Sequence, residues 1–257
     1  MTEPLLRVRG LDKNFGRVAA CRAVSLDLWP GEVLGIVGES GSGKTTLLRC
    51  LSGELEPSAG TIEFRAAEGP FEDVYRMGEA RRRFLMRTQW GIVHQNPRDG
   101  LRMRVSAGGN VGERLMAAGE RHYGRIRAEA VAWLDRVELD PARIDELPAL
   151  FSGGMQQRLQ IARILVSRPR IVYLDEPTGG LDVSIQARLL DLLRRLVRDL
   201  ALAVVIVTHD LGVARLLTDR LMVMRRSEVV EEGLTDQVLD DPHHAYSQLL
   251  VSSVIGA

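Results

Sequence analysis

A glycine-rich segment near the start of the chain carries the residue types that bind phosphate. Residues 38–46 read GESGSGKTT, after the apolar run VLGIV at 33–37 and before the amphipathic run TLLRCLSG. Glycines let a loop curl so that backbone N–H groups point at an anion. A helix that opens directly behind the loop adds the positive end of its dipole. Strand, glycine loop and helix in this order predict a phosphate site.

The polar residues of this segment suggest which ligand it takes. Lys44 is expected to reach the β- and γ-phosphates of ATP, and the Thr45 hydroxyl is expected to bind Mg²⁺. The rest of the expected binding set is Gly38, Ser40, Gly41, Gly43 and Thr46. The alternative is a glycine-rich surface turn before a helix. That reading leaves the lysine and the hydroxyl unexplained, so the sequence predicts ATP and Mg²⁺ as cofactors.

A second buried strand is expected to end in two acids. Residues 171–177 read IVYLDEP, an apolar run followed by Asp175, Glu176 and a proline. Asp175 would hold Mg²⁺, and Glu176 would act as general base on the attacking water. Neighbouring side chains on a strand point to opposite faces, so the two roles require the strand to end by Glu176. A pair of acids capping a helix fits poorly, because Pro177 and the apolar run indicate a strand end.

Two further side chains follow predicted strands. Gln95 stands at the end of the strand expected in GIVHQNP, 91–97, which Pro97 stops, and His209 follows the apolar part of AVVIVTHD at 203–210. Ligands of open α/β sheets lie beyond the carboxyl ends of strands. Gln95 is therefore placed to contact Mg²⁺ or the attacking water, and His209 to contact the γ-phosphate. Alone, either residue is more often structural, and both gain weight from the phosphate loop and the acidic strand end.

A second anion-binding helix start is predicted at FSGGMQQR, residues 151–158. Ser152 is a typical N-cap residue, and Gly153 and Gly154 follow it. An ordinary capped helix is the alternative for this octet alone.

Two isolated residues are weaker candidates for the nucleotide site. Asp182, in the turn TGGLDVS at 178–184, could cap the next helix or reach across an interface. Phe15, in a polar break between strands, could stack on a purine ring. A half-buried strand phenylalanine is an equally good interpretation of its position.

The hydrophobic periodicity predicts an α/β fold. Residues 5–28 alternate as antiparallel strands broken near 14–17, and residues 98–170 are mostly helical in pattern. A basic helix is expected over 75–86, and residues 100–110 are expected to form an exposed loop between helices. We therefore expect a mostly parallel core sheet, an N-terminal antiparallel β-subdomain and an inserted helical subdomain. One domain would cover 1–257, with core and β-subdomain in 1–97 and 166–257 and the helical part at about 98–165.

Composition excludes several classes of partner. The 257 residues contain 34 Lys+Arg and 34 Asp+Glu, and zero net charge argues against a nucleic acid. A solvated helix face or a docking surface explains the arginines at 81–83. Cys21 and Cys50 have no paired spacing, which predicts ordinary thiols in a reducing cytoplasm. The longest apolar run, 201–207, falls short of the ~18 residues of a membrane span, so direct membrane insertion is not expected.

Taken together and in order, these segments resemble the ATP-binding subunit of an ABC-type ATPase over the whole chain. GESGSGKT matches the phosphate loop, Gln95 the Q-loop, FSGGM the signature, IVYLDEP the Walker B strand, GGLD the D-loop and His209 the switch histidine. Phe15 falls where the family has its adenine-stacking aromatic.

The resemblance implies a head-to-tail dimer of two copies. Each ATP would lie between residues 38–46 of one copy and 152–155 of the other, with ATP closing the dimer and hydrolysis opening it. The usual signature is LSGGQ. Methionine at position 155 departs from it and removes the nucleotide contact that the family's glutamine provides.

Different segments point to different branches of the family. The tail DPHHAYSQLLVSS resembles oligopeptide importers, so the energising subunit of an oligopeptide, nickel-type or phosphonate importer is one interpretation. Three other segments instead resemble the ATP-binding subunit of the carbon–phosphorus lyase system of phosphonate breakdown. They are the residues that follow the Q-loop, the segment TQWGIVHQNP, and the segment FSGGMQQRLQIARILV together with the later GGLD. That resemblance implies docking on lyase core subunits rather than on a permease. A module that holds ATP without hydrolysing it is the third interpretation, and Glu176 and His209 argue against it.

Overall fold

The structure, a computed structural model, describes residues 3–66 and 69–255 and divides into two compact units. The first unit comprises Met1–Arg83 and Ala201–Ala257, and the second comprises Phe84–Leu200. In the described residues, no helix is long and apolar enough to cross a membrane.

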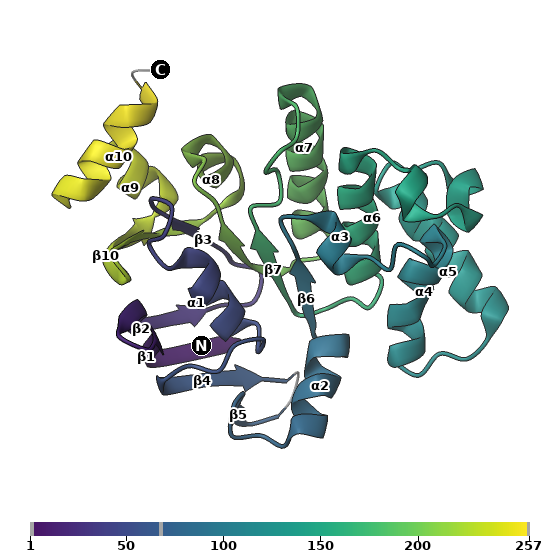
Figure 1. The fold of residues 1–257 in the computed structure, drawn as a ribbon, viewed down its shortest axis with the longest axis horizontal. Coiled ribbons are helices and arrows are strands. Elements are labelled where there is room, and N and C mark those ends of the chain that lie inside the picture. Colours follow the sequence, from purple (N-terminus) through teal and green to yellow (C-terminus); the bar gives the residue numbers. More distant parts are fainter. Residues whose placement is uncertain (1–2, 67–68, 256–257) are drawn as a thin grey trace. The chain divides into compact units, whose positions relative to one another are not determined.

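The first unit holds two sheets (Figure 1). Its strands are β1 (Leu6–Phe15), β2 (Val18–Leu28), β3 (Val33–Val37), β4 (Ala59–Arg65), β5 (Phe71–Asp73), β8 (Ala203–Val207), β9 (Arg220–Arg225) and β10 (Glu228–Leu234). Its helices are α1 (Lys44–Leu51), α8 (Leu211–Leu217), α9 (Thr235–Asp240) and α10 (Ala245–Ile255). The antiparallel sheet has the order β2-β1-β4-β5. In the other sheet β3 lies between β8 and β9, parallel to both, and β10 pairs antiparallel with β9.

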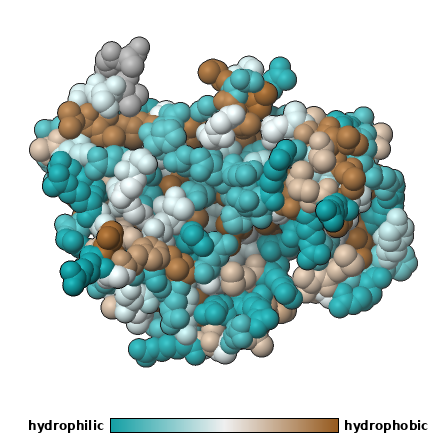
Figure 2. Space-filling model, in the orientation of Figure 1, coloured by the Kyte–Doolittle hydropathy of each residue, from teal (hydrophilic) through white to brown (hydrophobic). Residues whose placement is uncertain are grey.

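Burial explains why these strands form. All five residues of β3 and all five of β8 are buried, as expected for parallel strands covered on both faces. α10 carries one large apolar side chain on its outer side. Figure 2 shows apolar surface where α10 lies in Figure 1, and Leu249 on this helix is 64% exposed.

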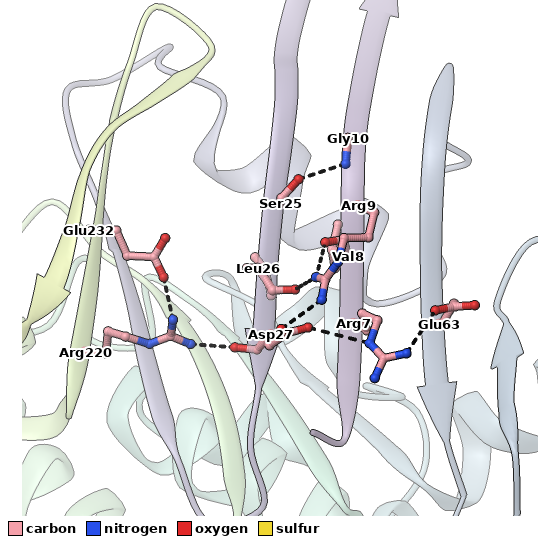
Figure 3. A network of polar contacts seen from close by, with 10 residues as sticks. All are labelled: Arg7, Val8, Arg9, Gly10, Ser25, Leu26, Asp27, Glu63, Arg220 and Glu232. Carbon is pink, nitrogen blue, oxygen red and sulfur yellow. Dashed lines mark hydrogen bonds and ion pairs between the residues drawn. The ribbon is translucent and has the colours of Figure 1, made fainter. Parts of the chain in front are cut away.

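Arg220 links the two sheets of the first unit (Figure 3). Its guanidinium donates to the carbonyl oxygen of Asp27 on β2 and pairs with Glu232 on β10. Its Nε donates to Glu32 Oε1 at 2.8 Å. Three acceptors on a half-buried guanidinium fix the geometry of this junction more firmly than an exposed ion pair would.

The second unit is rich in helices (Figure 1). Its parallel strands β6 (Trp90–Val93) and β7 (Ile171–Asp175) pair with each other. Its helices are α3 (Pro97–Gly100), α4 (Ala107–Ala117), α5 (Tyr123–Arg136), α6 (Gly153–Leu165) and α7 (Val183–Asp199), with short 3-10 helices at Pro141–Asp145 and Pro148–Leu150. α2 (Glu79–Thr88) spans the boundary between the units.

The predicted α/β class is confirmed, and three local expectations are corrected. The strand expected over 91–97 ends at Val93, because Asn96 and Pro97 start α3; proline is favoured in a first helical turn. The helix expected over 75–86 runs from Glu79 to Thr88. Residues 100–110 are not wholly an exposed loop, because α4 begins at Ala107 and Asn110 is fully buried.

Candidate functional site

Residues 38–43 form a tight loop between β3 and α1 in the first unit, and residues 44–46 are the first of α1. Gly38, Gly41 and Gly43 have φ values of 149°, 78° and 105°, a region that side chains with a Cβ rarely adopt. A Cβ on Gly38 would lie 2.1 Å from the Met224 carbonyl oxygen, and one on Gly43 would lie 2.0 Å from that of Ala20. The loop therefore needs glycine at both positions for conformation and for space.

The Lys44 side chain folds back onto the first two residues of this loop. Its side chain is only 6% exposed, and its Nζ donates to the carbonyl oxygens of Gly38 and Glu39, both at 2.8 Å. The ammonium group that is expected to bind phosphate is therefore hydrogen-bonded to the loop itself. Other residues of the expected set are open to solvent: Ser40, Gly41 and Thr45 are exposed, and Thr46 is half-buried.

His209 leaves the sheet beside this loop. β8 pairs with β3 in register Ile36 with Val207, so residue 38 and residue 209 follow the same carboxyl edge of neighbouring strands. His209 is exposed there, as a contact to a bound anion requires.

Phe15 is the last residue of β1, and its side chain is 53% exposed. The Nζ of Lys13 lies 5.2 Å from the centroid of its ring. An open aromatic face beside a cation suits stacking on a base, and this role stays a prediction.

In the second unit, the structure brings together Gln95 and Glu176. β6 and β7 pair with Val93 opposite Leu174, so both residues follow the same edge. Gln95 Nε2 donates to Glu176 Oε2 at 3.1 Å. Glu176 has a φ of 41°, so the chain has left the strand after Asp175. The two acids therefore avoid the opposite-face constraint of a continuing strand, as their separate roles require.

Gln160 on α6 clamps the backbone just before Gln95. This side chain is fully buried; its Oε1 accepts from His94 N at 2.7 Å and its Nε2 donates to His94 O at 3.2 Å. The amide thus pairs with His94 as a neighbouring strand would. A Cβ on Gly100 would lie 2.1 Å from Gln160 Oε1, so this clamp requires glycine at position 100.

The same helix carries the predicted serine–glycine segment at its start. Ser152 is the N-cap of α6 and its Oγ accepts from Met155 N at 3.4 Å, as predicted for a capped helix. Gly153 is exposed, whereas Gly154 is buried against Ile185, whose Cγ2 would lie 2.6 Å from an added Cβ. A cavity of about 350 Å³ lies at this helix start and is lined by Gln95, Asn96, Pro97, Gly153, Gln157, Pro177, Gly179, Gly180 and Leu181.

Asp182 occupies the N-cap position of α7. Its side chain makes no capping hydrogen bond and is exposed, so the capping alternative is not realised. The interface alternative stays a prediction.

The two cysteines are buried free thiols. Burial raises the pKa of Cys21 to about 12 and that of Cys50 to about 11, so both are protonated at neutral pH.

Comparison with known proteins identifies the family. The family model described as ABC transporter matches residues 21–179. The chain belongs to this family. Its fold resembles a dimeric ATP-binding cassette in a post-hydrolysis state with bound ADP and Pi, with a TM-score of 0.79 and 28% identity over 90% of this chain and 98% of that one. The chain is accordingly an ATPase that binds ATP.

Relatives of this ATPase include two kinds of named protein. It is 65% identical, over 99% of each chain, to the putative phosphonates utilization ATP-binding protein PhnK of Escherichia coli (strain K12). It is 34% identical to the dipeptide transport ATP-binding protein DppD of Bacillus subtilis (strain 168), over 98% of this chain and 77% of that protein.

Two sets of contacts at these sites were not predicted from the sequence. The Gln160 clamp is one, and a hydrogen bond from Glu39 N to the Tyr246 hydroxyl at 2.9 Å is the other. Both join residues far apart in the chain, which periodicity does not reveal. A glutamine at a buried helix position and a tyrosine in a polar tail are the only local signals.

Proposed function

We propose that this ATPase is the ATP-binding and hydrolysing subunit of a carbon–phosphorus lyase complex and drives a conformational step in phosphonate breakdown. The observation that carries the proposal is the 65% identity, over 99% of both chains, to the phosphonates utilization protein of Escherichia coli. Its partners would be lyase core subunits and a second copy of itself, with ATP closing the dimer. It would act in the cytoplasm, without direct membrane insertion and without a nucleic acid.

The residues of the proposed site fall into groups with separate roles. Lys44 and the backbone N–H groups of 38–46 would bind the phosphates. Mg²⁺ would be held by Thr45, Asp175 and Gln95, a set of hydroxyl, carboxylate and amide oxygens that suits this hard cation. The Mg²⁺ would neutralise charge that develops on the phosphates.

The remaining residues would act on the water, the base and the second nucleotide. Glu176 would polarise the attacking water, and His209 would contact the γ-phosphate. Phe15 would stack on the adenine. The partner-facing set, which would contact ATP held by the second copy, is Ser152, Gly153, Gly154 and Asp182.

The experiment for the complex is affinity capture of the tagged chain without detergent or membranes. The proposal expects lyase core subunits to copurify, and more of them with ATP and the variant Glu176→Gln than with Lys44→Ala. The recovery of only a membrane permease would contradict it.

A second candidate is the energising subunit of an importer of the oligopeptide, nickel-type or phosphonate kind. The identity to the dipeptide transport protein and the importer-like tail favour this candidate. Reconstitution with a permease discriminates: substrate uptake that requires this chain supports the importer, and uptake that proceeds equally without it opposes it.

A further inference from the structure

We propose that the C-terminal segment, residues 220–251 (the tail), stabilises residues 38–46 by hydrogen bonds to their backbone, and that Tyr246 is a positioning residue for nucleotide binding. The proposal rests on the function proposed above for residues 38–46 as the phosphate loop. All of the contacts that carry it lie within the first unit.

The first contact is at the start of the loop. The Tyr246 hydroxyl accepts a hydrogen bond from Glu39 N at 2.9 Å, and the Glu39 carbonyl oxygen accepts from Lys44 Nζ at 2.8 Å. Both backbone polar atoms of Glu39 are thus engaged, one by the tail and one by the lysine that is expected to bind phosphate. A shift of Tyr246 therefore acts on the same residue that orients Lys44.

The second contact is three residues further along the loop. Ser227 N donates to the Ser42 carbonyl oxygen at 3.1 Å. Ser227 lies in the tight turn between β9 and β10, where Arg226 and Ser227 have φ values of 48° and 73°. Its Oγ donates to Ala19 O at 2.7 Å, so the turn is itself fixed to β2. The tail therefore holds the loop at two points, Glu39 and Ser42.

The tyrosine is held firmly enough to act as a brace. It is 6% exposed and packs in a buried apolar cluster with Val37, Leu211, Ala214, Leu221, Val223, Val238 and Leu239. The Arg225 guanidinium lies 4.7 Å from the centroid of its ring. The Glu231 carboxylate on β10 accepts from His243 N at 2.7 Å and His244 N at 3.1 Å, which fixes the chain just before α10.

A braced loop should affect the affinity for ATP rather than the rate of turnover. Three glycines at positive φ give the free loop many conformations, and a ligand that must order the loop loses affinity in doing so. The hydroxyl of Tyr246 removes part of this cost before the nucleotide arrives. It does not lie among the residues proposed to act on the water, so turnover at saturating ATP should be insensitive to it.

The test is Tyr246→Phe, which keeps the ring and deletes only the hydroxyl. We expect ATP to bind about 3- to 10-fold more weakly, the range of one lost hydrogen bond, with kcat within about twofold of the parent. The matched control is Tyr75→Phe. The Tyr75 hydroxyl donates to Cys50 O at 2.8 Å and Leu55 O at 2.7 Å, at the far end of α1. This control should keep the parental affinity even if it lowers the thermal midpoint.

Lys44→Ala separates this proposal from the function on which it rests. If Lys44→Ala binds ATP as the parent does, the phosphate-loop assignment fails. If Lys44→Ala loses ATP while Tyr246→Phe keeps the parental affinity, the brace alone is overturned. Equal weakening in Tyr246→Phe and Tyr75→Phe would also overturn it, because general destabilisation would then explain both.

Amide hydrogen exchange on the parent protein tests the brace without any variant. The Glu39 amide should exchange at least about 10-fold more slowly than that of its exposed neighbour Ser40, because only the former is bonded to the tail hydroxyl. Equal exchange at the two amides would overturn the proposal.

Discussion

Two regions of the molecule are stabilised differently. The hydrogen bonds that fix residues 38–46 are made to main-chain atoms of the loop, whereas those around Gln95 and Glu176 are made by the side-chain amides of glutamines. In the first region, Lys44, Tyr246 and Ser227 all bond to main-chain atoms of the loop. In the second, Gln95 donates to the carboxylate of Glu176, and Gln160 clamps the residue before Gln95.

From this difference we infer that the two regions contribute to different steps, ATP binding and ATP hydrolysis. Fixed backbone N–H groups offer a prearranged cradle for an anion, which serves binding. A side-chain hydrogen bond such as that from Gln95 to Glu176 can open, which would suit the roles proposed for these two residues toward Mg²⁺ and the attacking water. The left-handed backbone of Glu176 is of the kind that accumulates at functional sites. Supports of the first region should therefore govern affinity, and supports of the second should govern turnover.

The largest effect is expected from Glu176→Gln, which removes the proposed general base and keeps the side chain's size. ATP hydrolysis should fall by about 10²- to 10⁴-fold, the usual contribution of such a base, while ATP binding is kept. Phosphate release measures the rate, and gel filtration with ATP should show a trapped dimer. Hydrolysis at the parental rate would show that the general-base assignment is wrong.

Lys44→Ala comes next and should act on binding. The lost charge-assisted contacts to phosphate correspond to about a 10- to 150-fold loss of ATP affinity. Arg76→Ala is the control, because Arg76 is an exposed cation that pairs with Asp73 and is not among the proposed site residues. Titration with a fluorescent ATP analogue measures both variants. Equal losses would place the phosphate contact elsewhere.

Gln160→Leu should lower the free energy of unfolding by about 1–3 kcal/mol, because it leaves the His94 N–H and C=O without their buried partner. Gln237→Leu, at an exposed position of α9, should change it by less than about 0.5 kcal/mol. Urea denaturation of the two variants gives the comparison. If both are equally stable, the clamp contributes nothing to the second region.

The smallest effect is expected from Glu231, whose carboxylate holds the tail just before α10. Burial alone would raise the pKa of Glu231, but hydrogen bonds to the carboxylate, including those from the His243 and His244 amides, outweigh it and lower the pKa. Because the folded pKa lies below the ordinary value of 4.5, the stabilisation is present above about pH 4.5 and is lost as the pH falls through the folded pKa.

Glu231→Gln tests this anchor. It should lower the thermal midpoint by about 1–3 °C at pH 7, and the gap should close in acid. A gap that persists unchanged at pH 3 would contradict the assignment to the carboxylate.

The strands, the phosphate loop and the acidic strand end could be predicted because each is encoded locally. VLGIV and AVVIV are continuous apolar runs of the kind that buried parallel strands need, and the glycines of 38–46 follow the first directly. Pro177 and the neighbouring acids mark the end of the other strand. These signals depend on neighbouring residues and survive without any knowledge of tertiary contacts.

The start of α4 was missed although it carries a local signal, because Ser106 caps the helix and its Oγ accepts from Gly109 N at 3.2 Å. The Asn110 amide donates to the carbonyl oxygens of Arg102, Val105 and Ser106, and its oxygen accepts from Arg102 N. This closes a loop that glycine content alone suggested was open. Tyr246 and Gln160 could not be predicted for a different reason, because their partners lie 207 and 66 residues away in the chain.

The division between the two regions is tested most directly by measuring ATP affinity and single-turnover hydrolysis on Tyr246→Phe and Gln160→Leu side by side. The account predicts a crossed result. Tyr246→Phe should bind ATP about 3- to 10-fold more weakly and hydrolyse bound ATP at the parental rate. Gln160→Leu should bind ATP as the parent does and hydrolyse it about 10-fold more slowly or worse, because the backbone next to Gln95 is displaced. Two variants that lose affinity and rate in the same proportion would contradict the account.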